Sequence, residues 1–117
     1  DVADDGNIVV TDAGAGAHDT IISVAIEEHH TDADVVPAGI DKPMSGHHHL
    51  LIDVEKLPDM KLPIPADKNH LHFGKGQKEA IIELPKGKHT LQLLLGNYLH
   101  IPHDMPLISE RIEIIVK

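Results

Sequence analysis

The sequence contains no cysteine and no tryptophan, and Phe73 and Tyr98 are its only phenylalanine and tyrosine. Without cysteine, the chain can form no disulfide bond, no thiolate metal site and no cysteine nucleophile. Any metal ion that it binds must therefore take nitrogen, oxygen or thioether ligands. With so few aromatic side chains, we expect the hydrophobic core to be aliphatic.

Positive charge is also scarce, since 10 Lys and Arg residues stand against 19 Asp and Glu residues, for a formal net charge of -9. An acidic chain repels nucleic-acid phosphates and anionic membrane surfaces, so we expect neither as a partner. No segment approaches the roughly 18 continuous apolar residues of a membrane span, and a span is not expected.

The chain begins with Asp1 rather than with methionine. Removal of a signal peptide would explain this start, and so would trimming of the chain. We favour export to a periplasmic or extracellular (secreted) location. Histidine-rich sites that bind metal by affinity suit a compartment in which metals are less tightly buffered.

The apolar pattern of the chain is typical of β-strands. In residues 20–26, for example, Ile22, Val24 and Ile26 alternate with smaller or polar residues. Further strands are expected in NIVVT, HHLLIDV, HLHF, KEAIIEL, HTLQLLL and ERIEIIVK, separated by turns rich in proline and glycine. No window shows the 3.6-residue period of an amphipathic helix. The sequence therefore predicts an all-β fold, a single immunoglobulin-like antiparallel β-sandwich of about seven strands over residues 1–117.

Residues 1–17 combine the short apolar strand NIVVT with a flexible segment of glycine and alanine. This strand can fold onto its own domain or pair with the sheet edge of a neighbouring molecule, which is β-strand addition. The second arrangement would give a homo-oligomer or a filament by donor-strand complementation. A structural, self-assembling subunit is therefore the alternative to the function derived below.

The chain has 11 histidines, far above ordinary usage, and several lie in the stretches GHHHLLID, NHLHFGKG and HIPHD. Side chains alternate between the two faces of a strand, so His47 and His49 would share a face with Cα atoms about 6.5–7 Å apart. Two imidazoles at this spacing can converge on one ion, and His70 and His72 repeat the spacing. One such pair more often indicates a solvated strand face, but two pairs together with His100 and His103 favour a metal site.

The remaining histidines have less specific patterns. His48 falls on the face of Leu50 and Ile52, so we expect it to be buried and hydrogen-bonded to backbone, where it could orient a ligand. It remains among the candidate metal residues. His89 begins the apolar face of the HTLQLLL strand and fits a structural role or a ligand equally well. The last three are expected to face solvent, although His29 or His30 could form a secondary metal site: His18, His29 and His30.

The segments GHHHLLID, PIPAD, HLHFGKGQ, PKGKHTLQL and HIPHD resemble, in this order, the bacterial domain-of-unknown-function family 4399. The resemblance covers about residues 37–116 and implies a small exported β-domain whose histidine segments form a metal site. It places eight histidines in the family's motifs: His47, His48, His49, His70, His72, His89, His100 and His103.

Neutral imidazole is a good ligand for copper, zinc, iron and nickel, and Cu(II) binds most strongly among the divalent ions. The lack of a thiolate excludes the blue-copper arrangement. The sequence contains no nucleophile elbow, no phosphate-binding glycine loop and no HExxH motif, so we predict no catalytic residues. The prediction is an exported metal-binding protein, with copper as the ion and zinc as the alternative.

Overall fold

The computed structural model describes residues 2–4, 8–15, 19–26, 34–41, 45–103, 107–109 and 111–117. These ranges contain no helix, and therefore none long and apolar enough to cross a membrane. They contain nine strands: β1 (Val2–Asp4), β2 (Ile8–Ala15), β3 (Thr20–Ile26), β4 (Asp34–Val35), β5 (Ser45–Ile52), β6 (His70–His72), β7 (Glu79–Leu84), β8 (Gly87–Gly96) and β9 (Ile112–Val116). The seven predicted strands are all present, and the short β1 and β4 are additional.

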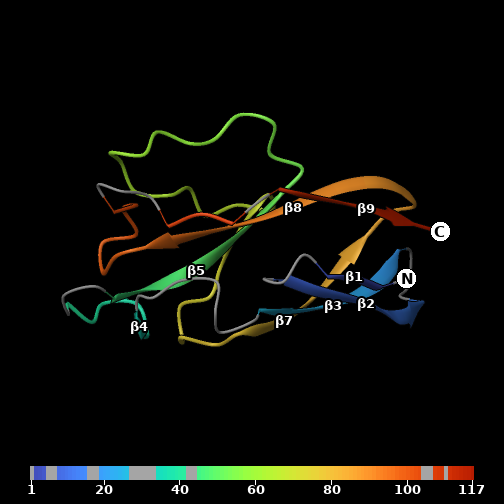
Figure 1. Cartoon of the computed structure of the whole chain (residues 1–117), viewed down its shortest axis with the longest axis horizontal. Coiled ribbons are helices and arrows are strands. Elements are labelled where there is room, and N and C mark those ends of the chain that lie inside the picture. The colour runs from blue at the N-terminus through green and yellow to red at the C-terminus, as the bar shows by residue number, and fades with distance from the viewer. Residues whose placement is uncertain are drawn as a thin grey trace.

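The strands form two layers, which Figure 1 shows on either side of the core. One sheet has the order β1-β2-β3-β7, and the other has the order β4-β5-β8-β9 with β6 also pairing with β5. All pairings are antiparallel except that of β4 with β5. The predicted all-β sandwich is thus confirmed.

The N-terminal segment pairs within its own chain. β2 lies antiparallel to β3, with Ile8 opposite Ile26, and the pairing shifts between Asp12 and Gly14. Gly14 lies at this β-bulge and has a φ of 118°. Any residue with a side chain would be strained in that backbone conformation. Because Ile8 and Val10 are buried in the core, β2 packs into the sandwich of its own chain.

The main core lies between the two sheets and is aliphatic apart from Phe73, as the composition predicts. Leu50 and Ile52 of β5 and Leu91 and Leu93 of β8 point into it. Each fully buried side chain of this size contributes about 1.5–3 kcal/mol to folding. β5 and β8 are therefore firmly anchored from the inside of the sandwich.

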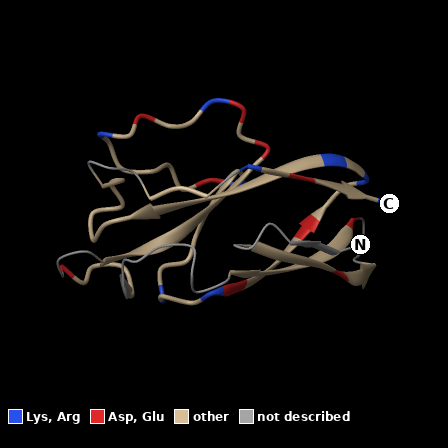
Figure 2. Cartoon of the chain, in the orientation of Figure 1, with Lys and Arg blue, Asp and Glu red and all other residues tan. Residues whose placement is uncertain are grey.

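The outer face of β5 is covered as well, so every residue of this strand is buried. Leu51 packs there with Leu94 and with Ile64 of the long segment between β5 and β6. Figure 1 shows this segment in green above the second sheet. Its charged side chains face solvent, whereas β5 itself carries none (Figure 2). Irregular segments therefore cover the outer side chains of β5.

Candidate metal centre

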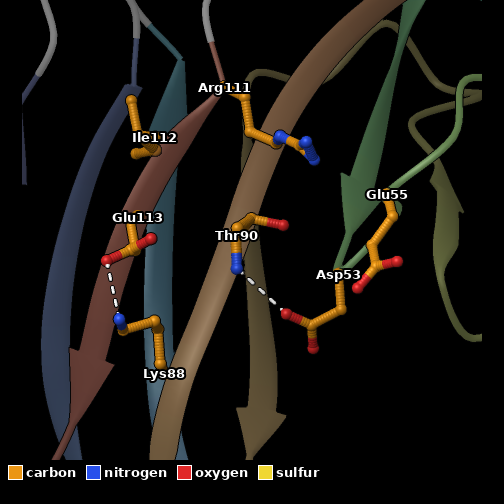
Figure 3. Close-up of a pocket in the computed structure, with 7 residues that line it drawn as sticks. All are labelled: Asp53, Glu55, Lys88, Thr90, Arg111, Ile112 and Glu113. Atoms are coloured by element: carbon orange, nitrogen blue, oxygen red, sulfur yellow. Dashed lines mark hydrogen bonds and ion pairs between the residues drawn. The ribbon is translucent and has the colours of Figure 1, made fainter.

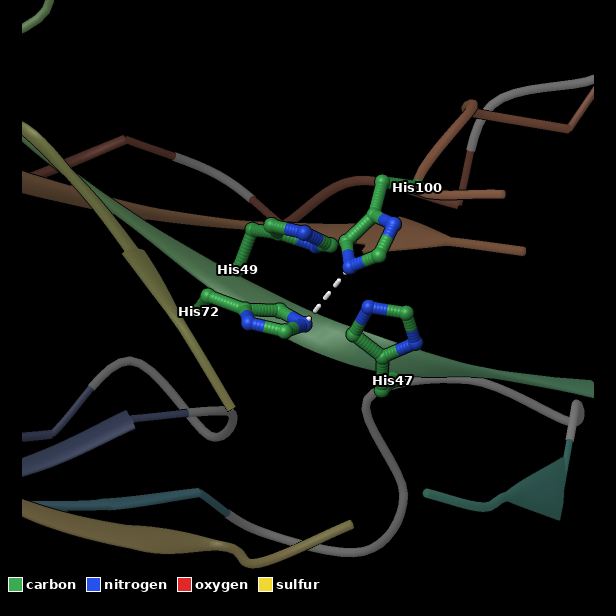
Figure 4. Close-up of side chains that lie close together, drawn as sticks. All are labelled: His47, His49, His72 and His100. Carbon is green, nitrogen blue, oxygen red and sulfur yellow. Dashed lines mark hydrogen bonds between the residues drawn. The ribbon is translucent and has the colours of Figure 1, made fainter. Parts of the chain in front are cut away.

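Four histidines from three segments gather on the outer face of β5: His47, His49, His72 and His100 (Figure 4). Each offers one ligand nitrogen, and these four atoms all lie within 4.8 Å of one another. The ring centroids are 4.5 to 5.7 Å apart. The cluster joins two residues of β5, one of β6 and one of the loop that follows β8.

β5 contributes His47 and His49 because side chains on a strand alternate between faces. Both point to the outer face, with relative exposures of 0% and 1%. His48 lies between them on the inner face, beside the main core, and is also buried. The structure thus has the alternation that the sequence predicts for this run of three histidines.

The pairing of β6 with β5 brings in His72. His49 lies directly opposite His72, and Leu51 lies opposite His70. A turn fixes this register, because the carboxylate of Asp67 accepts from the backbone N–H of Asn69, whose side chain donates to the Ile52 carbonyl. The position of His72 therefore depends on a turn that lies at least 18 residues along the chain from His47 and His49.

The loop after β8 brings in His100 in a conformation that few residues adopt. His100 has a φ of 64°, in the left-handed region that costs a non-glycine residue energy. The side chain of Asn97 holds the loop by accepting from the N–H groups of Leu99 and Ile101, and the His100 carbonyl accepts from Ile64 N–H. Strain of this kind persists only where surrounding contacts hold it, and it often marks functional positions.

Two glycines leave room for the rings. A Cβ on Gly74 would lie 2.5 Å from Cε1 of His72, and a Cβ on Gly96 would lie 2.8 Å from Cε1 of His49. Neither glycine has a positive φ, so backbone conformation is not what requires them. Sequence reasoning missed Gly74, Gly96 and Asn97, although each lies two to four residues from a histidine of the cluster.

The electrostatics of the site keep the buried rings neutral. Burial, and then the repulsion between charged rings, lowers the pKa of His47 from 6.5 to about 4. Burial and the other three rings lower the pKa of His49 to about 3, with a smaller opposite effect of the nearby His47 backbone. The pKa of His72 is also lowered, first by burial and then by the ring of His100. Neutral imidazole is the form that binds a metal ion.

The ring nitrogens of the buried pair also lack ordinary partners. Within the described part of the chain, neither Nδ1 nor Nε2 of His47 or of His49 makes a hydrogen bond. A buried polar group without a partner costs about 1–3 kcal/mol. A bound cation would coordinate one nitrogen of each ring, so the arrangement fits a metal site.

The distances also fit a metal ion. Around a zinc ion, four imidazole nitrogens at about 2.0–2.1 Å lie about 3.3 Å from one another in a tetrahedron. Nε2 of His72 and Nε2 of His100 are already 2.9 Å apart, and all four ligand atoms lie within 4.8 Å of one another. No carboxylate belongs to this group among the described residues, so the ligand set is neutral.

The other four histidines of the predicted set lie outside this group. His70 Nδ1 pairs with Asp67 at 2.8 Å, His103 Nε2 donates to the Ser45 carbonyl at 3.0 Å, and His48 faces the core. His89 contacts Asp53 through Nδ1 and the Pro85 carbonyl through Nε2. His18, His29 and His30, which were expected to face solvent, lie outside the described residues.

A separate hollow lies beyond the end of β5, between Asp53 and β9 (Figure 3). Asp53 accepts from the backbone N–H of Thr90 there, and Lys88 pairs with Glu113 at 3.4 Å. The charged residues that line the hollow are exposed and carry both signs. It contributes no residue to the histidine cluster.

Comparison with known proteins agrees with the sequence motifs. The model of the family described as Domain of unknown function (DUF4399) matches residues 24–117, which begin within β3. No curated protein and no solved structure matches the chain. With most of the sandwich and all four clustered histidines inside the matched region, the chain belongs to the DUF4399 family.

Proposed function

We propose that this protein binds a copper ion through His47, His49, His72 and His100. The observation that carries the proposal is the convergence of four ring nitrogens within 4.8 Å. Two of these rings are buried, and their nitrogens make no hydrogen bond to any residue that the structure describes. Imidazoles placed in this way are costly for a fold without a ligand and favourable for one with a cation.

Copper is the preferred ion, and zinc is the alternative. A site of neutral imidazoles suits both ions, and Cu(II) binds more strongly than Zn(II) to the same ligands. An exported location, periplasmic or extracellular, forms part of the proposal. A site without thiolate or carboxylate ligands selects by affinity and by metal availability, and copper is more available outside the cytoplasm's buffering systems.

Metal uptake tests the proposal directly. Purified protein is incubated with excess Cu(II) or Zn(II), desalted, and analysed for metal per chain. We expect about one copper per chain in the wild type and none in the His47→Ala/His49→Ala variant.

A matched control is the variant His70→Gln/His103→Gln, which removes two histidines of the sequence motifs that lie outside the cluster. This control should keep its copper. Absence of copper from the wild type, or an equal loss from the control variant, would contradict the proposal.

A further inference from the structure

We propose that the cluster passes its metal to and from a partner by ligand exchange at His72. The partner is a metal carrier, protein or small chelate, that presents nitrogen or oxygen donors of its own. This inference rests on the proposed function, because it concerns the same four histidines.

The first observation is that the four ligands are not equally accessible. His47 and His49 are fully buried, His100 is half-buried, and His72 is exposed. Structural metal sites have all their coordination positions filled by protein ligands, whereas sites that react with an incoming group keep one position open. In this cluster, such a position would open where the exposed His72 leaves the ion.

The second observation is that the ligands differ in how firmly their backbone is held. His47 and His49 lie on β5, which is buried on both faces and paired with β8 over six residue pairs. His72 is the last residue of β6, which has three residues and, among the described strands, pairs with β5 alone. Exposed side chains change rotamer within nanoseconds, so the His72 ring can leave while the buried pair keeps its position.

The third observation concerns the space beside His72. Gly74 follows two residues later and has no side chain, and a Cβ there would meet only atoms of the His72 ring among its three nearest contacts. One side of the ring therefore lies against the backbone of Gly74, and the side chain is exposed. A donor group can approach His72 from solvent without displacing a side chain of Gly74.

The transfer replaces one ligand of the metal by another. One bond from the metal to a donor of the partner forms, and the bond from the metal to His72 breaks. The metal keeps its oxidation state, and a partner donor that arrives protonated releases its proton to water. The remaining histidines then yield in order of exposure, His100 before the buried pair.

Transfer kinetics test the inference. Copper-loaded protein is mixed in a stopped-flow instrument with increasing concentrations of free L-histidine, and the loss of the protein's copper absorbance is followed. We expect the rate to rise with the concentration of L-histidine, because the acceptor takes part in the step. In His72→Ala, with the position already open, the second-order rate constant should rise about tenfold, as for a barrier lowered by 1.4 kcal/mol.

Two further variants distinguish exchange at His72 from a general weakening of the site. Gly74→Ala should accelerate transfer in the same way, because its Cβ displaces the His72 ring. His49→Ala opens a buried position that the acceptor cannot reach. It should therefore weaken copper binding, but the transfer rate should not depend more strongly on the concentration of L-histidine.

The outcomes separate this inference from the proposed function. A wild type that takes up no copper overturns both. A loaded wild type that loses copper at a rate independent of L-histidine, or His72→Ala and His49→Ala with equal second-order rate constants, overturns the exchange at His72 and leaves copper binding in place.

Discussion

The Nε2 atoms of His72 and His100 lie 2.9 Å apart, although 28 residues separate the two histidines along the chain. At this distance one neutral ring donates its Nε2–H to the other. A metal ion bound by both Nε2 atoms would replace this hydrogen bond and require each ring to carry its proton on Nδ1. The contact therefore holds the two outer rings close to the positions that a shared ion demands.

Copper should stabilise the folded protein, because the unfolded chain does not hold the four imidazoles together. Free copper at about 100 times the dissociation constant raises the free energy of unfolding by about 2.7 kcal/mol. Thermal unfolding with and without Cu(II) measures the effect, and a chelator should reverse it. In the His47→Ala/His49→Ala variant the melting temperature should not respond, and an equal response there would count against the site.

Without metal, the protein should lose stability as the pH falls. The pKa of His47 is about 4 and that of His49 about 3 in the folded chain, against 6.5 when unfolded. Between pH 6.5 and about 3, the unfolded chain therefore binds protons that the folded chain does not, so the free energy of unfolding decreases with falling pH. Each pKa unit between the two states corresponds to at most about 1.4 kcal/mol.

Urea unfolding of metal-free protein at several pH values between 7 and 4 measures this loss. Carboxylates also titrate in this range, so the informative quantity is the difference from His47→Gln/His49→Gln. That variant should show the shallower dependence on pH. Parallel curves for the two proteins would mean that the buried rings do not resist protonation.

The sequence predicts part of the site because alternation is a local property. The spacing of His47, His48 and His49 is enough to place the outer two on one face and the middle one on the other. The same rule places His70 and His72 on one face of β6. It does not tell which of them meets the cluster, because that depends on the register of β6 against β5.

Strand alternation does not predict which loop residues become ligands. From the sequence, His100 and His103 are equally good candidates for metal ligands. In the structure, His100 joins the cluster and His103 does not. The choice follows from its left-handed backbone and from hydrogen bonds to Asn97 and Ile64. These are long-range and conformational features that no strand period contains, whereas the aliphatic sandwich itself follows from alternation and turn residues.

Substitutions at His100 should separate backbone strain from metal binding. A left-handed conformation costs a non-glycine residue about 1–2 kcal/mol, so His100→Gly should be about 1 kcal/mol more stable than His100→Ala. Both variants lack the imidazole and should bind copper equally weakly. Urea unfolding and copper titration of the pair measure the two effects, and equal stabilities would show that the φ of 64° is not strained.

Gly74→Ala should weaken copper binding by displacing the His72 ring rather than by unfolding the protein. The new Cβ would lie 2.5 Å from Cε1 of His72, which is an exposed side chain that can move. A double-mutant cycle tests this cause. In the His72→Ala background, Gly74→Ala should have almost no further effect on copper affinity, and an additive loss would point to a different origin.

Asp53 should stabilise the protonated form of His89. Burial lowers the pKa of His89, but hydrogen bonds to Asp53 and to the Pro85 carbonyl outweigh it, so that the pKa is raised. Asp53 has a φ of 56°, which asparagine also tolerates, so Asp53→Asn removes the charge with little backbone cost. In an NMR titration, the His89 pKa should fall in this variant.

The same pair should affect stability with a defined sign. Because the folded pKa of His89 lies above its unfolded value, its contribution is fully present below pH 6.5 and is lost as the pH rises through the folded pKa. Asp53→Asn should therefore destabilise the protein more at pH 6 than at pH 9. A difference that is constant over this range would rule out a charged imidazole at position 89.

The outer face of β5 is closed by irregular segments rather than by a third sheet, and one backbone hydrogen bond, from Ile64 N–H to the His100 carbonyl, joins two of them. Segments of this kind open locally with a smaller free energy than the strands beneath them. Amide exchange at Ile64 should consequently be faster than at the paired residues of β8 in the metal-free protein. A cation bound by His100 and by the histidines of β5 would make the two exchange rates more similar. The segments that cover the site would then unfold together with the sandwich, and the bound ion would be the cause of this cooperativity.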